Sequence, residues 1–107
     1  MKHIGVGNFL LLSGVLIFPG IGHAQNAYEG EHVARQWCSG CHQVADEPNL
    51  HGDNVPPFSA IAKMNSTTAM SLTAFLESSH KSMPDFSLTR KEIRDVSAYI
   101  LSLRKPQ

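Results

Sequence analysis

Cys38, Cys41 and His42 are the residues of this chain best placed to do chemistry, and they stand together in the segment Cys38-Ser39-Gly40-Cys41-His42. Two thiols at this spacing can each add to one vinyl group of a haem, which forms two thioether bonds. A histidine directly after the second cysteine can then bind the haem iron through an imidazole nitrogen. The spacing therefore predicts covalent attachment of one c-type haem, with His42 making it a redox centre.

Three other kinds of site also use cysteines at this spacing. A thioredoxin-type redox motif needs a βαβ frame, and the chain has no alternating or β-branched strand runs. A structural disulfide between Cys38 and Cys41 suits an exported protein, but it would close a very short loop and stabilise little. Zinc needs four ligands at recognisable spacing, whereas His32, His51 and His80 are scattered and no second cysteine pair exists. Haem attachment is the favoured interpretation.

Residues 1–24 have the pattern of a secretory signal peptide. Lys2 gives a short positive start, an apolar run follows at Phe9–Phe18, and Gly22-His23-Ala24 offers small residues for cleavage. The run is too short for a comfortable transmembrane helix, although an uncleaved anchor remains the alternative. Because there is no twin arginine, we expect the general secretion route to a bacterial periplasm, with no stable membrane insertion after cleavage.

Removal of the signal leaves 83 residues, 25–107, which is the length of one small domain. A chain this short buries a limited core and usually needs an additional source of stability, which a covalently bound apolar haem would provide. Loss of Lys2 leaves eight Lys and Arg against nine Asp and Glu. This near-neutral balance argues against nucleic-acid binding.

The hydrophobic pattern of the mature chain predicts four helices and no strands. The first three are expected at Asn26–Trp37, at Phe58–Met64 and from a cap at Ser66 or Thr67 to about Ser79. Candidate inward positions on the first two are Ala27, Val33, Ala34, Trp37, Ile61 and Ala62, and the apolar residues of the third are Met70, Leu72, Phe75 and Leu76. Turn-forming residues place loops at 43–57 and 80–88.

The fourth helix has the clearest signals. Thr89-Arg90-Lys91-Glu92 is a capping box, in which the Thr89 hydroxyl and the Glu92 carboxylate satisfy free amides of the first turn. Apolar residues then recur at helical spacing, at Ile93, Val96, Ile100 and Leu103. The chain is thus expected to form an all-α domain.

A second axial ligand for the iron can come from six side chains: Met64, Met70, Met83, His32, His51 and His80. Met64 and Met70 lie on expected helices, where methionine is more often core filler. His32 is too close in sequence to His42 to reach the opposite face of the haem easily. His51 and His80 lie in loops and can reach it, but loop histidines are usually solvated.

Met83 differs from the other candidates because it lies in a loop immediately before Pro84, which restrains the backbone. It also follows His42 by 41 residues, which is enough chain to wrap round a haem. A neutral thioether would favour ferrous iron and raise the reduction potential. The residues therefore favour Met83, with a packing role as the alternative.

Over residues 28–103 the chain resembles the small bacterial class I cytochromes c. Three segments carry the resemblance, in the expected order and at the expected distances: the cysteine motif, the proline-aromatic segment Pro56–Ala62, and Met83-Pro84 followed by Leu88-Thr89 and Glu92-Ile93. The resemblance implies the all-α cytochrome c fold, about four short helices wrapped round one haem c. It also implies axial ligation by His42 and Met83.

The same resemblance assigns further roles. The carbonyl of Pro56, or alternatively Pro57, should accept a hydrogen bond from the second ring nitrogen of His42. Gly30 matches a glycine that lets the first helix touch the last one, and Tyr99 matches the aromatic that it meets.

The chain departs from the family pattern in two places. Ala34 stands where many relatives carry an inward aromatic residue. The only tryptophan, Trp37, directly precedes the cysteine motif, so no tryptophan further along the chain can contact the haem propionates. The haem propionates would therefore meet Lys63, an amide or water.

These features predict a monomeric periplasmic protein that carries one electron at a time between larger redox proteins, such as a dehydrogenase, reductase or oxidase. With His42 and Met83 on the iron, no enzyme activity is expected, and partner docking should be weak and fast. The alternative is a haem protein with an openable sixth position that binds a diatomic gas or reacts with peroxide, and His80 would then be its polar group.

Overall fold

The computed structural model describes residues 14–17, 25–48, 50, 52 and 54–104. Its elements follow the order α1 (Ala27–Val33), the π-helix η1 (Ala34–Cys38), α2 (Phe58–Lys63), α3 (Ala69–Leu76) and α4 (Arg90–Ser102). Within this described part there is no strand, apart from an isolated bridge between His80 and Met83. The all-α expectation is confirmed. The expected signal peptide, 1–24, lies outside the described residues except for 14–17.

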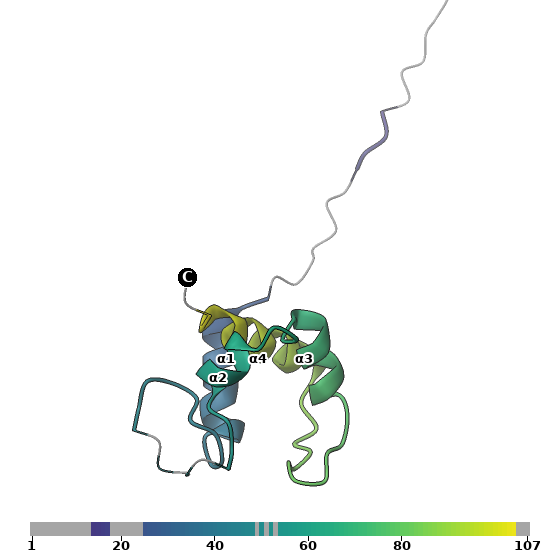
Figure 1. Ribbon diagram of the computed structural model, residues 1–107. Coiled ribbons are helices and arrows are strands. Elements are labelled where there is room, and N and C mark those ends of the chain that lie inside the picture. The colour runs from purple at the N-terminus through teal and green to yellow at the C-terminus, as the bar shows by residue number, and fades with distance from the viewer. Residues whose placement is uncertain (1–13, 18–24, 49, 51, 53, 105–107) are drawn as a thin grey trace, which may run out of the picture.

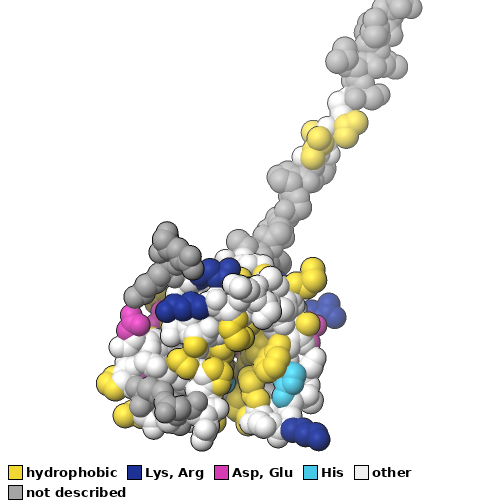
Figure 2. Space-filling view, viewed as in Figure 1, with side chains coloured by type: hydrophobic (Ala, Val, Ile, Leu, Met, Phe, Trp, Pro, Cys, Tyr) yellow, Lys and Arg dark blue, Asp and Glu magenta, His cyan; other side chains and the backbone are white. Residues whose placement is uncertain are grey.

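Two loops face each other across the molecule (Figure 1). One follows η1 and lies on the side of α1 and α2, whereas the other follows α3 on the opposite side, and α4 connects the two sides. The space-filling view shows hydrophobic side chains gathered along a hollow between these sides (Figure 2). No helix in the described segments is long and apolar enough to cross a membrane.

The first helix begins at Asn26, whose side-chain oxygen accepts hydrogen bonds from the amides of Tyr28 and Glu29, at 3.0 and 3.3 Å. It continues without a break into η1, where the amide of Ser39 donates to the carbonyl of Ala34 at 3.0 Å. This wider turn adds a residue just before the cysteine motif, and such π turns are frequent at functional sites. The expected helix is confirmed, but its last turn is a π-helix.

Helices α1 and α4 cross in direct contact at Gly30. A Cβ atom at this position would lie 1.9 Å from the carbonyl oxygen of Asp95 and 2.9 Å from the Cβ of Tyr99. Only a glycine allows the two backbones to approach this closely. The expected meeting of Gly30 and Tyr99 is therefore confirmed.

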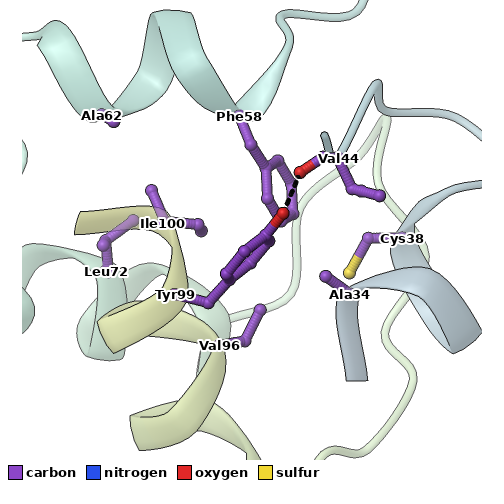
Figure 3. Packing of buried hydrophobic residues seen from close by; sticks show 9 residues of the cluster. All are labelled: Ala34, Cys38, Val44, Phe58, Ala62, Leu72, Val96, Tyr99 and Ile100. Carbon is purple, nitrogen blue, oxygen red and sulfur yellow. Dashed lines mark hydrogen bonds between the residues drawn. The ribbon is translucent and has the colours of Figure 1, made fainter. Parts of the chain in front are cut away.

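The core lies between α4 and the other helices, and Figure 3 shows its packing. Its buried members are Ala34, Cys38, Val44, Phe58, Ala62, Leu72, Val96, Tyr99 and Ile100. Trp37 was expected to be an inward position and Met70 a packing residue, and both expectations are wrong because these side chains are exposed, as is that of Phe75. Met70 is 82% exposed because the short helix α3 turns only a narrow face, marked by Leu72, toward α4.

The start of α3 also differs from the expectation. Thr68, rather than Ser66 or Thr67, is the capping residue, because its hydroxyl accepts from the amide of Ser71 while the Ser71 hydroxyl accepts from the amide of Thr68. The buried hydroxyl of Thr67 instead donates to the carbonyl of Ile61 at 2.7 Å. It thereby joins the segment that leads into α3 to the end of α2.

The predicted capping box of α4 is confirmed. The Thr89 hydroxyl accepts from the amide of Glu92 at 3.2 Å, and the Glu92 carboxylate accepts from the amide of Thr89 at 2.7 Å. The same contacts lower the pKa of Glu92. Ile93, Val96 and Ile100 are buried, as their spacing predicts.

Candidate haem-binding site

The cysteine motif forms the end of η1 and the turn after it. The amides of Cys41 and His42 both donate to the carbonyl of Cys38, at 3.1 and 2.9 Å. Cys38 is only 7% exposed and packs in the core (Figure 3), whereas Cys41 is exposed. Burial raises the pKa of the Cys38 thiol to about 11. The two thiols therefore lie in very different surroundings, one inside the fold and one on its surface.

The imidazole of His42 is oriented by Pro56. Its Nδ1 lies 2.7 Å from the carbonyl oxygen of Pro56, and its ring packs against Phe58 with centroids 5.3 Å apart. Because a carbonyl can only accept, Nδ1 must carry the hydrogen, and Nε2 of the neutral ring then keeps its lone pair. The contact leaves His42 with one nitrogen suited to bind a metal.

The loop that carries Pro56 is tied to α4 and to α2. The Tyr99 hydroxyl donates to the carbonyl of Val44 at 2.6 Å, and both groups are buried. Glu47 accepts from the amide of Val44 at 3.2 Å, and the amide of Phe58 donates to the carbonyl of Gln43 at 2.9 Å. These bonds hold both ends of the loop, so the position of Pro56 beside His42 is determined by the fold.

A cleft opens between η1 and the loop after α3. Its empty volume is about 390 Å³, part of it open to solvent. Its lining residues are Cys38, Leu76, Ser78, His80, Met83, Pro84, Asp85, Phe86 and Leu88. The structure thus brings Cys38 and the half-buried Met83 to one cleft, although 45 positions separate them in the sequence. Cys41, His42 and Pro56 are not among its lining residues.

The other candidate ligands are placed less favourably. His80 lines the cleft, but its ring stacks on Phe75 with centroids 3.7 Å apart, and its Nε2 lies 2.9 Å from the carbonyl oxygen of Phe75. His32 packs edge-on against Tyr28 on α1 and is not among the residues that line the cleft. His51 lies outside the described residues.

Met64 and Met70 do not line the cleft either. Both were expected to fill the core, and this is wrong because they are 50% and 82% exposed. Lys63, expected near the haem propionates, is exposed at the end of α2.

Sequence reasoning missed Phe86. Its ring lies in the cleft lining and meets the ring of Trp37 on η1, with centroids 5.5 Å apart. The one available signal was an aromatic residue standing just after Met83-Pro84 in a loop otherwise rich in polar residues. Its partner could not be read from the sequence, because Trp37 lies 49 positions earlier.

The residues present fit a covalently bound haem c. A haem is a large apolar disc, and the cleft has a mainly apolar lining with the buried Cys38 thiol on one side. The hydrogen bond from His42 to Pro56 leaves a metal-binding nitrogen on the same motif. The donor set combines thiols for thioether bonds with imidazole and thioether groups that suit haem iron.

Comparisons with known proteins agree with this chemistry. A family model described as cytochrome c oxidase, cbb3-type, subunit III matches residues 25–100. The chain is also similar to a protein named cytochrome c-552 from Bradyrhizobium diazoefficiens, with 33% identity over 102 residues that cover 95% of this chain and 98% of the relative. No solved structure matches the chain significantly. These matches confirm the class I resemblance and the cytochrome c fold. The chain therefore belongs to the cytochrome c family, as a small class I cytochrome c whose covalently bound haem c serves electron transfer.

Proposed function

We propose that this protein is a periplasmic electron carrier that holds its haem through Cys38 and Cys41, with His42 and Met83 as the two axial ligands. The observation that carries the proposal is the cleft that Cys38 and Met83 line together. The Nε2 lone pair of His42 and the sulfur of Met83 would then approach the iron from residues 41 positions apart. That separation suits ligands on opposite faces of the haem.

The bound haem supplies an iron that accepts or gives up a single electron. The protein's part is to hold and tune that iron. The Pro56 carbonyl keeps the proton of His42 on Nδ1 and makes the ring a stronger ligand. Bound to that iron, the Met83 thioether would favour the ferrous state, and the mainly apolar lining of the cleft would limit the access of water. With both axial positions filled by side chains, no position is left for a substrate, so we propose no enzyme activity.

The proposed location and partners rest on other features. The family match begins at residue 25, directly after the proposed signal peptide 1–24, which supports export and cleavage. A monomer that exchanges electrons with larger redox proteins would dock weakly and briefly, as small redox interfaces do.

The axial ligation is tested with Met83→Ala in the holoprotein. The oxidised wild-type protein should show the weak near-infrared charge-transfer band of a thioether–ferric haem bond. The variant should lose the band, have a lower reduction potential, and bind carbon monoxide rapidly in the ferrous state, because the sixth position is then open.

Met64→Leu and Met70→Leu are matched controls, since both side chains are exposed and outside the cleft lining. They should leave the band unchanged, and so should His80→Ala. If either control removes the band and Met83→Ala keeps it, Met83 is not the ligand. A wild-type protein without the band that binds carbon monoxide rapidly would favour the gas-binding or peroxide-reacting alternative, with His80 in the same cleft as its polar group.

A further inference from the structure

An aromatic pair joins the loop after α3 to η1 beside the cleft, and one of its two rings, Phe86, lies in the cleft lining. Trp37 directly precedes Cys38 on η1, and Phe86 follows Met83 by three residues. Their rings are tilted by 36° with centroids 5.5 Å apart, which is within the range of an attractive aromatic contact. Both Cys38 and Met83 line the cleft beside this pair.

The contact is at the surface rather than in the core. Trp37 is 38% exposed and Phe86 is 40% exposed, and neither belongs to the buried cluster. A pair in this position adds little to the packing of the helices. It instead brings the loop after α3 into contact with the helix that carries Cys38.

Among the described residues, the hydrogen bonds of that loop join positions that are close in sequence. His80 contacts the carbonyl of Phe75 at the end of α3, and the amide of Ser87 donates to the Asp85 carboxylate at 2.8 Å. Neither bond reaches η1. The ring contact between Phe86 and Trp37 therefore joins two sides of the cleft that these hydrogen bonds leave unconnected.

The backbone next to Phe86 supports a specific role for this residue. Ser87 has a φ of +52°, in the left-handed region that a residue with a side chain seldom adopts. The turn closed by Asp85 and Ser87 brackets Phe86. Such a conformation persists where surrounding contacts hold it, and it clusters at ligand-binding segments.

We infer that Trp37 and Phe86 form a latch that keeps the loop carrying Met83 closed, and so determines how often the sixth ligand leaves the iron. The inference rests on the proposed ligation by Met83. An exogenous ligand reaches the sixth position only in the fraction of molecules whose loop is open. Its apparent rate of binding therefore rises in proportion to that open fraction. Both residues are positioning residues, because neither is proposed to touch the iron.

The test measures the rate of carbon monoxide binding to the ferrous holoprotein of Trp37→Ala and Phe86→Ala. Each substitution should raise the rate by about two- to tenfold, the factor that corresponds to the coupling of one aromatic pair. The double variant should be no faster than the faster single variant, because both remove the same contact. Trp37→Phe and Phe86→Tyr keep an aromatic pair and should stay close to wild type.

Tyr28→Ala is the matched control, because it removes an exposed aromatic that contacts His32 on α1, away from the cleft lining. Its rate should be that of wild type. Denaturant unfolding of each holoprotein separates a local effect from a global one. A rise in rate that follows the loss of global stability across all variants, Tyr28→Ala included, would overturn the latch.

The two proposals can fail separately. A wild-type protein that lacks the thioether band contradicts the ligation by Met83. A wild-type protein that has the band, with Trp37→Ala and Phe86→Ala binding carbon monoxide at the wild-type rate, contradicts the latch alone. If Trp37→Ala does not accumulate as holoprotein, the rates of carbon monoxide binding to Phe86→Ala and Phe86→Tyr test the latch in its place. Equal rates for these two variants contradict it.

Discussion

Gly30 and Asp95 touch through their backbones where α1 crosses α4. A Cβ on Gly30 would lie 1.9 Å from the carbonyl oxygen of Asp95 and 2.4 Å from its carbonyl carbon. The atoms in the way belong to the backbone of a helix, so they cannot move aside as a flexible side chain would. The crossing of the first and last helices therefore depends on the absence of one methyl group.

Gly30→Ala should lower the free energy of unfolding of the holoprotein by about 3 kcal/mol or more, at the upper end of overpacking effects. Equilibrium denaturation followed by circular dichroism measures this. Gly40→Ala is the control, because no atom lies within 4 Å of a Cβ built there and its φ is not in the left-handed region. Equal stabilities of the two variants would show that the helices do not cross as described.

Asp95 should make stability depend on pH. Its carboxylate is buried, which alone would raise the pKa, but hydrogen bonds from Lys91 Nζ at 2.5 Å and the amide of Asn26 at 2.9 Å outweigh burial and lower it. In the unfolded chain an aspartate has a pKa of about 4. The ionised form therefore stabilises the fold fully above about pH 5, and this contribution is lost as the pH falls through the folded-state pKa.

Asp95→Asn should accordingly cost about 2 kcal/mol of unfolding free energy at pH 6, in line with hydrogen bonds to a charged group. The difference from wild type should shrink at pH 3. Asp46→Asn, at an exposed loop position, should change stability by less than about 0.5 kcal/mol at either pH. A penalty for Asp95→Asn that stays constant from pH 6 to pH 3 would rule out this linkage.

Tyr99 should stabilise the fold through its hydroxyl group as well as through its ring. In Tyr99→Phe the buried carbonyl of Val44 would lose its donor, at a cost of about 1–3 kcal/mol. Because Val44 begins the loop that carries Pro56, faster amide hydrogen exchange is also expected there. Tyr28→Phe removes a hydroxyl from a side chain that is 68% exposed and should have no measurable effect. A fully stable Tyr99→Phe variant would contradict the assigned hydrogen bond.

Haem attachment should require both cysteines. Cys38→Ala or Cys41→Ala should leave a single thioether or none, and little holoprotein should accumulate, because a chain of this size has a limited core without its haem. Haem staining after denaturing electrophoresis measures the covalent product. Ser39→Ala, which removes a hydroxyl that donates to the carbonyl of Arg35, should stain like wild type. A double cysteine variant that keeps its colour after acid-acetone extraction would exclude thioether attachment.

Local patterns were sufficient for much of this protein. The capping box at Thr89 and the helical spacing of Ile93, Val96 and Ile100 predict α4, because caps and apolar stripes act within one turn of their own helix. The cysteine motif predicts a haem for the same reason, since its chemistry is contained in five consecutive residues.

Contacts between distant segments could not be read in this way. Met70 and Phe75 are apolar residues of a predicted helix, but whether their side chains are buried depends on which neighbours α3 packs against. The pairing of Trp37 with Phe86 joins residues 49 positions apart, and no local preference specifies such a partner. Burial and long-range contacts depend on how the helices cross. That crossing results from the packing of all the helices together around one small core.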